Sequence, residues 1–148
     1  MGLIDEVRGQ RICIDTASII YFIERHPKYR NIIRPLFAEI AAGNIEAITS
    51  TITLLEVLVR PLKIGDESLA MKYLDILLSS QGMTTFEIFH EASEMASRLR
   101  AKYSIRTPDA IQIAVGILYH ATKFLTNDPA LKKVSEIEVL LLDDYLTK

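Results

Sequence analysis

Arg11-Ile12-Cys13-Ile14-Asp15 is the stretch of sequence that indicates the fold most directly. Three consecutive apolar residues leave no polar face, which is typical of a central strand in a parallel sheet, because such a strand is buried on both faces. The run ends in an acid, so a carboxyl group lies where a buried strand meets its loop. A carboxyl group in that position needs a partner, and we therefore interpret Asp15 as a functional residue.

Segments with strand character and segments with helix character alternate along the rest of the chain. Strands are expected at residues 11–15, 47–50, 83–86, 123–126 and 138–142. Helices are expected at residues 17–24, 31–42, 53–60, 66–79, 88–103 and 107–119, the third of them stopped by Pro61. This alternation favours an α/β fold, a sandwich with a mostly parallel sheet. No linker or repeat divides the chain, so residues 1–148 are expected to form a single domain.

Four acids lie close to the ends of expected strands or the starts of expected helices. Asp15 closes the first strand, and Asp128 lies two residues after the strand 123–126. Glu56 and Asp109 fall in the first turns of two helices. Ligands of open parallel sheets bind at the carboxyl ends of the strands, so these four carboxylates could converge at one edge of the sheet.

Clustered carboxylates repel one another, and burial raises the cost of ionising each, so such a cluster needs a cation. Oxygen ligands alone suit a hard cation, which predicts Mg²⁺ or Mn²⁺. The three histidines are scattered along the chain and there is one cysteine, so nothing favours zinc. The expected metal ligands are Asp15, Glu56, Asp109 and Asp128.

Helix capping is an alternative explanation for three of the acids. Thr107-Pro108-Asp109 has the pattern of an N-cap, a proline at N1 and an acid favoured by the helix dipole. Asp128-Pro129 also matches an N-cap followed by proline, and Thr53 with Glu56 could form a capping box. Capping explains each position alone, but it does not explain why all of them should lie at one edge.

Charge and cysteine content bound the functional class. The net charge is −2, which lacks the basic footprint that nucleic-acid-binding proteins usually have. Basic residues are nevertheless grouped, as at residues 25–34 and 98–106, where a solvated helix face is the simpler explanation. Cys13 cannot form an internal disulfide, the first residues lack the layout of a signal peptide, and no segment is long and apolar enough to span a membrane. These features favour a cytoplasmic protein.

Four segments, taken in order, resemble the sequence motifs of PIN domains. They are residues 12–20 (ICIDTASII), 53–58 (TLLEVL), 107–114 (TPDAIQIA) and 124–128 (FLTND). The ordered set is specific, and the resemblance covers nearly the whole chain, from residue 11 to residue 142. The length of the chain and the absence of further domains resemble the VapC-type toxins of bacterial and archaeal toxin–antitoxin pairs.

This resemblance implies a PIN-like α/β fold, a three-layer sandwich of the flavodoxin-like topology class. The same resemblance implies Mg²⁺- or Mn²⁺-dependent hydrolysis of RNA phosphodiester bonds. It also implies a homodimer and inhibition by a small cognate antitoxin protein. Carried over by position, Asp15, Glu56, Asp109 and Asp128 form the catalytic and metal-binding site, and Thr126 matches a hydroxyl position that supports it.

Two other functions remain open at this stage. The chain could be a non-catalytic PIN-like interaction module that keeps the acidic pocket as structure. It could also be a phosphoryl-transfer domain that uses Asp15 as the accepting group, although Ala17 stands where a phosphatase of the Asp-x-Asp type needs a second acid. The apolar side chains of Leu54, Leu58, Leu62 and Ile64 could reach the surface and contact an antitoxin or a second copy of the chain, or could simply belong to the core.

Overall fold

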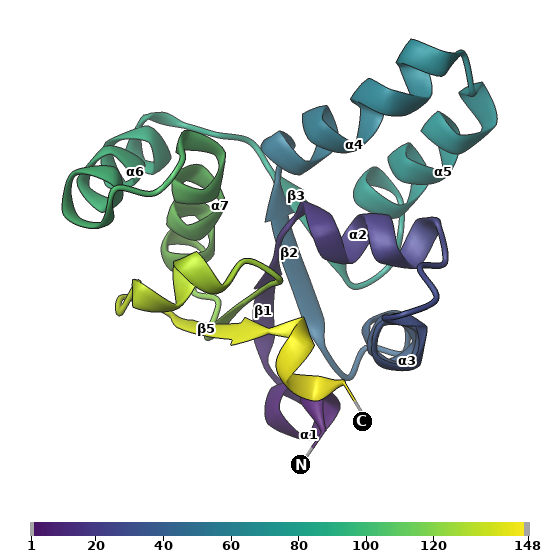
Figure 1. Cartoon of the computed structure of the whole chain (residues 1–148), viewed down its shortest axis with the longest axis horizontal. Coiled ribbons are helices and arrows are strands. Elements are labelled where there is room, and N and C mark those ends of the chain that lie inside the picture. The colour runs from purple at the N-terminus through teal and green to yellow at the C-terminus, as the bar shows by residue number, and fades with distance from the viewer. Residues whose placement is uncertain (1, 147–148) are drawn as a thin grey trace.

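The computed structural model describes residues 2–146, so residues 1, 147 and 148 of the expected domain lie outside the described residues. Its centre is a five-stranded sheet with the strand order β3-β2-β1-β4-β5 (Figure 1). The strands are β1 (Arg11–Ile14), β2 (Glu46–Ser50), β3 (Met83–Phe86), β4 (Lys123–Thr126) and β5 (Glu138–Leu141). Every neighbouring pair is parallel, which confirms the expected α/β fold class.

The apolar strand β1 forms the middle of this sheet. β1 pairs with β2 on one side and with β4 on the other, and Ile12 lies opposite both Ala47 and Lys123. Ile12, Cys13 and Ile14 are fully buried, as the apolar run predicts. Ile12 and Ile14 face one hydrophobic core, and Cys13 faces a second core on the opposite face of the sheet.

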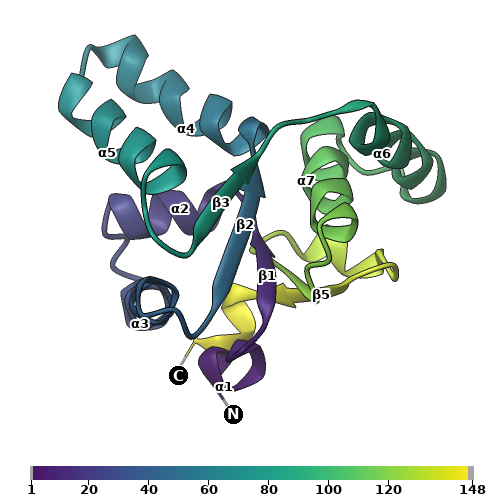
Figure 2. The same cartoon turned by 180° about the vertical axis from the view of Figure 1, so that it is seen from behind.

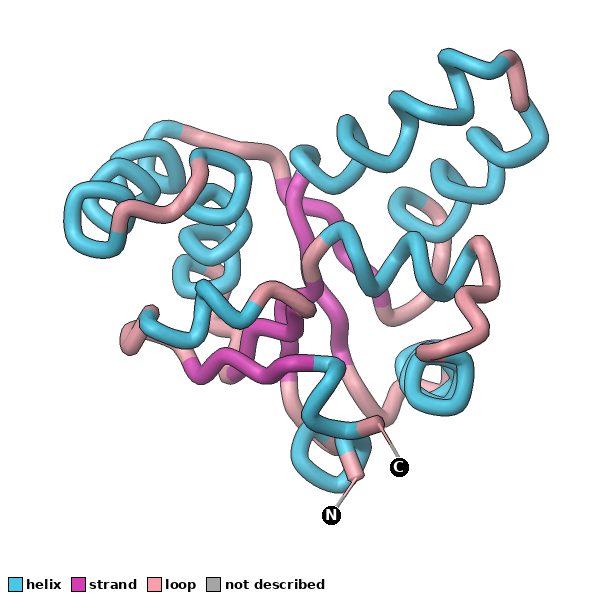
Figure 3. Tube along the Cα trace, viewed as in Figure 1, coloured by secondary structure: helices cyan, strands magenta, loops and turns pink. Residues whose placement is uncertain are grey.

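Helices cover both faces of the sheet, and Figure 2 shows the same arrangement from behind. One layer consists of α2 (Thr16–Ile23), α3 (Arg30–Ala41), α4 (Thr51–Ile64) and α5 (Glu67–Leu78). The other layer consists of α6 (His90–Tyr103) and α7 (Thr107–Leu118). Figure 3 shows the strands between these two groups of helices. Between residues 2 and 146, no helix combines the length and the apolar character that crossing a membrane requires.

Two details of the helices differ from the sequence-based expectation. α4 was expected to stop before Pro61, but it continues through Pro61 to Ile64. Pro61 is buried, and the helix ends instead at Gly65, which adopts the left-handed conformation (φ 73°) that glycine tolerates. A proline removes one helical hydrogen bond, and tertiary packing here outweighs that loss. The short helix α1 (Leu3–Val7) was not predicted at all.

The topology gathers several loops at one edge of the sheet. The strand order places β1 next to β4, and the chain leaves these strands toward opposite sides of the sheet. Doubly wound sheets bind ligands at such a switch point. The strand order of this sheet differs from that of flavodoxin, which is 2-1-3-4-5. Asp15 follows β1 directly, and Asn127 and Asp128 follow β4, so the two loops that flank the switch point both carry acids.

Candidate active site

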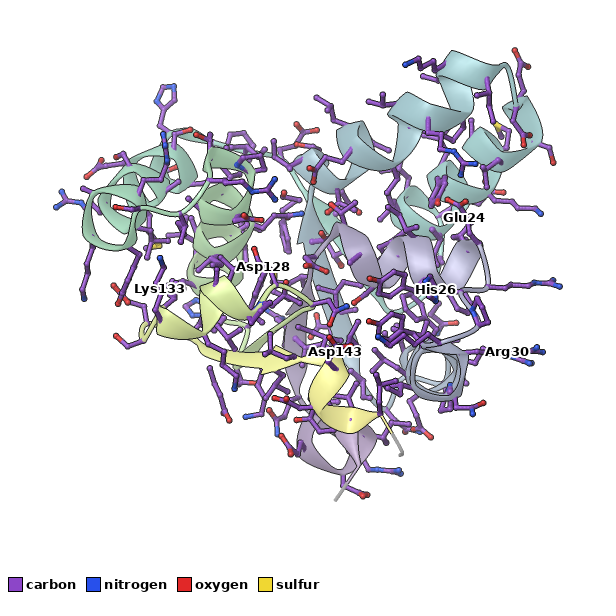
Figure 4. All side chains as sticks on the ribbon, in the orientation of Figure 1. Glu24, His26, Arg30, Asp128, Lys133 and Asp143 are labelled. Atoms are coloured by element: carbon purple, nitrogen blue, oxygen red, sulfur yellow. The ribbon has the colours of Figure 1, made fainter. Side chains whose placement is uncertain are left out.

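A cavity of about 340 Å³ lies at this edge, and all four predicted acids line it. Asp15 comes from the junction of β1 and α2, Glu56 from α4, Asp109 from α7 and Asp128 from the loop after β4. Figure 4 labels Asp128, which lies where that loop meets the 3₁₀ helix η1 (Pro129–Lys133). The other lining residues are Thr16, Ala17, Ile20, Tyr21, Arg106, Gln112 and Asn127. The structure therefore brings together carboxylates from four distant segments.

Asp15 is held in place by hydrogen bonds to both of its carboxylate oxygens. It is the N-cap of α2, where its Oδ1 accepts the backbone N–H of Ser18 at 3.5 Å. The hydroxyl of Thr126 donates to its Oδ2 at 2.5 Å. Burial raises the pKa of Asp15 to about 6, these hydrogen bonds oppose that rise, and the charge of Asp109 adds to it. Ionising the Asp15 carboxyl group therefore costs free energy unless a cation lies next to it.

Thr126 links two of the acids. Its hydroxyl oxygen accepts the backbone N–H of Asp128 at 3.2 Å while its proton goes to Asp15. Thr126 is fully buried at the end of β4, so the sheet fixes its position. This contact gives the predicted hydroxyl a definite role in orienting the Asp15 carboxylate.

Glu56 accepts a hydrogen bond from Thr16 at 2.6 Å, measured from Oγ1 to Oε1. It does not take part in a capping box, because the N-cap of α4 is Ser50, whose Oγ accepts the N–H of Ile52 at 3.3 Å. The capping explanation for Glu56 is therefore wrong. The side chain of Glu56 is oriented by the first residue of α2, next to Asp15.

Asp109 lies in the first turn of α7, as the sequence pattern indicated, and it also pairs with Arg106. The Nε of Arg106 lies 3.0 Å from Oδ2 of Asp109, and the Nη2 lies 3.4 Å from Oδ1. The N-cap of α7 is Arg106, so Thr107 is not the cap that the sequence pattern indicated. The Arg106 side chain is 74% exposed and that of Asp109 is 17% exposed. The hydrogen bonds to Asp109 and its charge raise the pKa of Arg106, and the charges of Asp128 and Glu56 add to this.

Asp128 does cap a helix, as Asp128-Pro129 predicts. Its Oδ1 accepts the N–H of Ala130 at 2.9 Å at the start of η1. The cap and the pocket are compatible, because the same side chain also lines the cavity.

A buried network of polar side chains beneath the site escaped the sequence analysis. The Oγ of Ser50 donates to Oε1 of Gln112 at 2.8 Å, and Nε2 of Gln112 donates to Oγ1 of Thr53. The hydroxyls of Thr53 and Thr49 also form a hydrogen bond at 2.8 Å. All four residues are buried. A single glutamine among the apolar residues of the segment 110–118 was the available signal. This network ties the starts of α4 and α7 together, and these helices carry Glu56 and Asp109.

Asn127 is a second residue that the sequence analysis missed. Its Nδ2 donates to the hydroxyl of Tyr29 at 2.8 Å and to that of Tyr21 at 3.2 Å. Its Oδ1 is buried without a hydrogen-bond partner among residues 2–146. A buried amide oxygen without a partner in the wall of a cavity calls for water or a cation.

The donor set fits a hard divalent cation in its chemistry. Four carboxylates and an amide oxygen offer only oxygen ligands, and the cavity is wide enough for an ion and water. Within residues 2–146, however, no three Asp, Glu, His or Cys side chains lie close enough together to hold one ion as they stand. The carboxylate of Asp109 is instead paired with the guanidinium group of Arg106.

Comparison with known proteins agrees with this architecture. The family model of the PIN domain matches residues 12–137, which is most of the chain. No protein among curated sequences matches. The chain belongs to the PIN domain family, as its four motifs indicate.

Solved structures with the same fold include proteins of toxin–antitoxin systems. The VapBC2 complex of Rickettsia felis, bound to a promoter DNA fragment, has a TM-score of 0.69 at 19% identity, and 88% of this chain and 98% of that chain are covered. A toxin–antitoxin complex of Klebsiella pneumoniae has a TM-score of 0.66 at 20% identity over 88% and 97%. VapC20 of Mycobacterium tuberculosis, a toxin that cleaves the sarcin–ricin loop, has a TM-score of 0.66 at 15% identity over 86% and 98%. At these identities the likeness shows the fold.

Proposed function

We propose that this protein is a metal-dependent ribonuclease that hydrolyses RNA phosphodiester bonds as the toxin of a toxin–antitoxin pair. The observation that carries the proposal is the cavity at the switch point of the sheet, which carboxylates from four segments line. Membership of the PIN domain family supports it, as does the fold shared with VapC20, which cleaves RNA in the sarcin–ricin loop.

The residues that line the cavity would have different roles in binding the metal ion and the attacking water. Asp15, Asp109 and Asp128 would hold Mg²⁺ or Mn²⁺, with Glu56 binding the ion or orienting the attacking water. A bound divalent ion lowers the pKa of water and neutralises charge on the phosphate. Thr126 keeps one oxygen of Asp15 fixed, and Thr16 does the same for Glu56. The ion would also favour the ionised form of Asp15, because burial raises the pKa of this carboxyl group to about 6.

Cleavage of a structured RNA mixture with Mg²⁺, with Mn²⁺ and with EDTA tests the proposal. Asp15→Asn and Asp109→Asn are each expected to abolish cleavage while the circular dichroism spectrum stays that of the wild type. Asp144→Asn is the matched control, since Asp144 is an exposed acid in η2 (Leu142–Tyr145), outside the residues that line the cavity. Cleavage that persists in EDTA, or in a folded Asp15→Asn variant, would contradict the assignment.

We further propose that a protein partner covers the exposed face of α4. Leu55, Val59 and Leu62 follow one another at helical spacing and are 56–64% exposed, and Ile64 at the end of the helix is 59% exposed. Of the four candidates from the sequence, Leu62 and Ile64 are exposed, whereas Leu54 and Leu58 pack against the core. An apolar stripe of this kind suits an antitoxin or a second copy of the chain. The complexes from Rickettsia felis and Klebsiella pneumoniae contain such a partner.

Gel filtration of the chain alone and of the chain co-expressed with its candidate antitoxin tests the partner proposal. The double variant Leu55→Ser/Val59→Ser should lose the dimer or the complex without loss of metal-dependent cleavage. Unchanged elution of both species would place the contact elsewhere.

One observation favours a second candidate function, a non-catalytic interaction module. The carboxylates as they stand are too far apart to hold one ion, and Arg106 already neutralises Asp109. Titration with Mn²⁺ separates the two functions. A ribonuclease binds the ion in the cavity, whereas a module that keeps its acids as structure does not bind Mn²⁺ and keeps its partner affinity in EDTA.

A further inference from the structure

A second and larger cavity, of about 530 Å³, lies between α2, α3 and α5. Its charged lining residues are all cations: Arg25, Arg30, Arg34 and Lys72. Phe22 and Ile23 supply the apolar part of the wall. No acidic residue of the described chain lines this cavity, so its charge has the opposite sign to that of the candidate active site.

The positive charge of this cavity is not neutralised within residues 2–146. None of its four cations lies within ion-pair distance of a carboxylate. Glu24, which precedes Arg25, is engaged elsewhere: its Oε1 lies 2.9 Å from Nη1 of Arg60, and its other oxygen accepts the hydroxyl of Tyr73. All four cations are exposed, so a ligand can reach them.

The cationic surface continues along α3. Arg30 and Arg34 are one helical turn apart and therefore share a face, and both also line an adjoining cavity of about 390 Å³. Figure 4 shows the Arg30 side chain extending from α3 away from the body of the protein. Two guanidinium groups side by side can each take a phosphate through two parallel hydrogen bonds.

Arg25 has a backbone conformation that arginine seldom adopts. Its φ is 54°, and the N–H of His26 closes the end of α2 by donating to Tyr21 O at 3.0 Å. Glycine is the usual residue at this position after a helix, because it adopts the left-handed conformation without strain. This left-handed backbone conformation sets the direction in which the Arg25 side chain leaves the end of α2, where the residue lines the cavity.

We propose that this cationic cavity binds backbone phosphates of the RNA strand beyond the site of cleavage. The proposal rests on the ribonuclease function and assigns the substrate a second contact. Asp15 is the N-cap of α2, and Arg25 lies just beyond the end of this helix, so a helix of eight residues, about 12 Å long, lies between the acidic ligand and the cationic cavity. A stacked strand carries one phosphate per about 3.4 Å, so three or four nucleotides span that distance.

The charges of the two cavities explain why RNA needs such a contact. The acidic cavity repels phosphate, and the chain as a whole carries a net charge of −2. Affinity for RNA must therefore come from cations that are concentrated in one place, and this cavity concentrates four of them.

RNA binding without cleavage tests the proposal. A fluorescently labelled single-stranded RNA of mixed sequence is titrated in EDTA against three proteins, with fluorescence anisotropy measured over a range of salt concentrations. The three proteins are the wild type, the cavity variant Arg30→Gln/Arg34→Gln/Lys72→Gln, and the control variant Arg8→Gln/Lys63→Gln/Arg98→Gln. The control removes the same number of exposed cations from other surfaces. Glutamine keeps the helices, and circular dichroism checks the fold of each variant.

The cavity variant should bind RNA about tenfold or more weakly. The association constant of the wild type falls as salt rises, and for the variant the slope of log K against log[salt] should be less negative by about 2, which corresponds to three lost phosphate contacts. The control should match the wild type. Equal losses in both variants, or none in either, would overturn the proposal. So would tighter, cavity-dependent binding of a poly-glutamate peptide than of RNA, since it would identify an acidic protein segment as the ligand. Binding is measured without metal, so a protein that fails to cleave RNA can still show binding that depends on the cationic cavity. Conversely, metal-dependent cleavage without cavity-dependent binding would refute the proposed phosphate contact and leave the ribonuclease function standing.

Discussion

The guanidinium group of Arg106 donates two hydrogen bonds to the carboxylate of Asp109, at 3.0 and 3.4 Å. The same carboxylate is a proposed ligand of the divalent ion, so the arginine and the ion compete for it. Arg106 thus acts as an internal counter-ion, which makes the acidic cavity tolerable in the absence of metal.

Arg106→Gln is expected to strengthen metal binding. Removing the competing cation frees Asp109, and an ion pair with one exposed partner contributes about 0.2–1 kcal/mol. The affinity for Mn²⁺ should therefore rise by up to about fivefold. Isothermal titration calorimetry with Mn²⁺ measures this change.

The control for this variant is Arg98→Gln. Arg98 is 77% exposed and pairs with Glu94 at 3.1 Å on α6, so it loses a similar ion pair away from the cavity. Its Mn²⁺ affinity should equal that of the wild type. An Arg106→Gln variant that binds Mn²⁺ no better than Arg98→Gln would show that Arg106 does not compete with the ion.

Asp15→Asn should stabilise the metal-free protein at alkaline pH. The folded pKa of Asp15 is raised from 3.8 to about 6, so folding favours the protonated group. That contribution is complete below pH 3.8 and is lost as the pH rises through about 6. Asparagine carries no charge and avoids the loss, so at about pH 8 the variant should gain about 2–3 kcal/mol in free energy of unfolding.

Urea denaturation of the metal-free protein at about pH 8 and about pH 3 measures the effect, because the gain should vanish below the unfolded pKa of 3.8. Asp144→Asn controls for the change in net charge. A gain of equal size at both pH values would attribute the stabilisation to packing and not to the buried charge.

The sequence predicts the strands and the acids well for a local reason. The apolar run of β1 and the motifs around Glu56, Asp109 and Asp128 are patterns of consecutive residues. The strand order β3-β2-β1-β4-β5 was not predicted, because it depends on which distant strands pair. The Arg106–Asp109 pair and the position of Gln112 depend on side-chain geometry and on contacts between α4 and α7, which no local pattern encodes. The continuation of α4 through Pro61 likewise depends on tertiary packing, which outweighs helix propensity.

Gly82→Ala should strongly destabilise the fold. Gly82 has a φ of 84°, and a Cβ there would lie 2.3 Å from the carbonyl oxygen of Ile40, which is backbone and cannot move freely. The matched control is Gly43→Ala, which has a φ of 85° but open space around the added Cβ. The control should lose about 1–2 kcal/mol from backbone strain alone, and Gly82→Ala clearly more. Equal losses in urea denaturation would mean that the chain relaxes around the contact with Ile40.

Thr126→Val should weaken metal binding in a way that depends on pH. Valine preserves the shape of the side chain but cannot donate to Asp15, and a hydrogen bond to a charged group is worth about 1.5–3 kcal/mol. Because that bond favours the ionised carboxylate, its loss raises the pKa of Asp15 above about 6, and protons then compete better with the ion.

The affinity of Thr126→Val for Mn²⁺ should consequently fall about tenfold near pH 6 and approach the wild-type value at about pH 9, where the carboxyl group is ionised in both proteins. Thr126→Ser restores the hydroxyl and should restore the affinity at the lower pH. Thr122→Val, which removes an exposed hydroxyl just before β4, should have no effect at either pH. If Thr126→Val lost affinity equally at both pH values, the hydroxyl would act by shaping the cavity, and its hydrogen bond would not control the charge of Asp15.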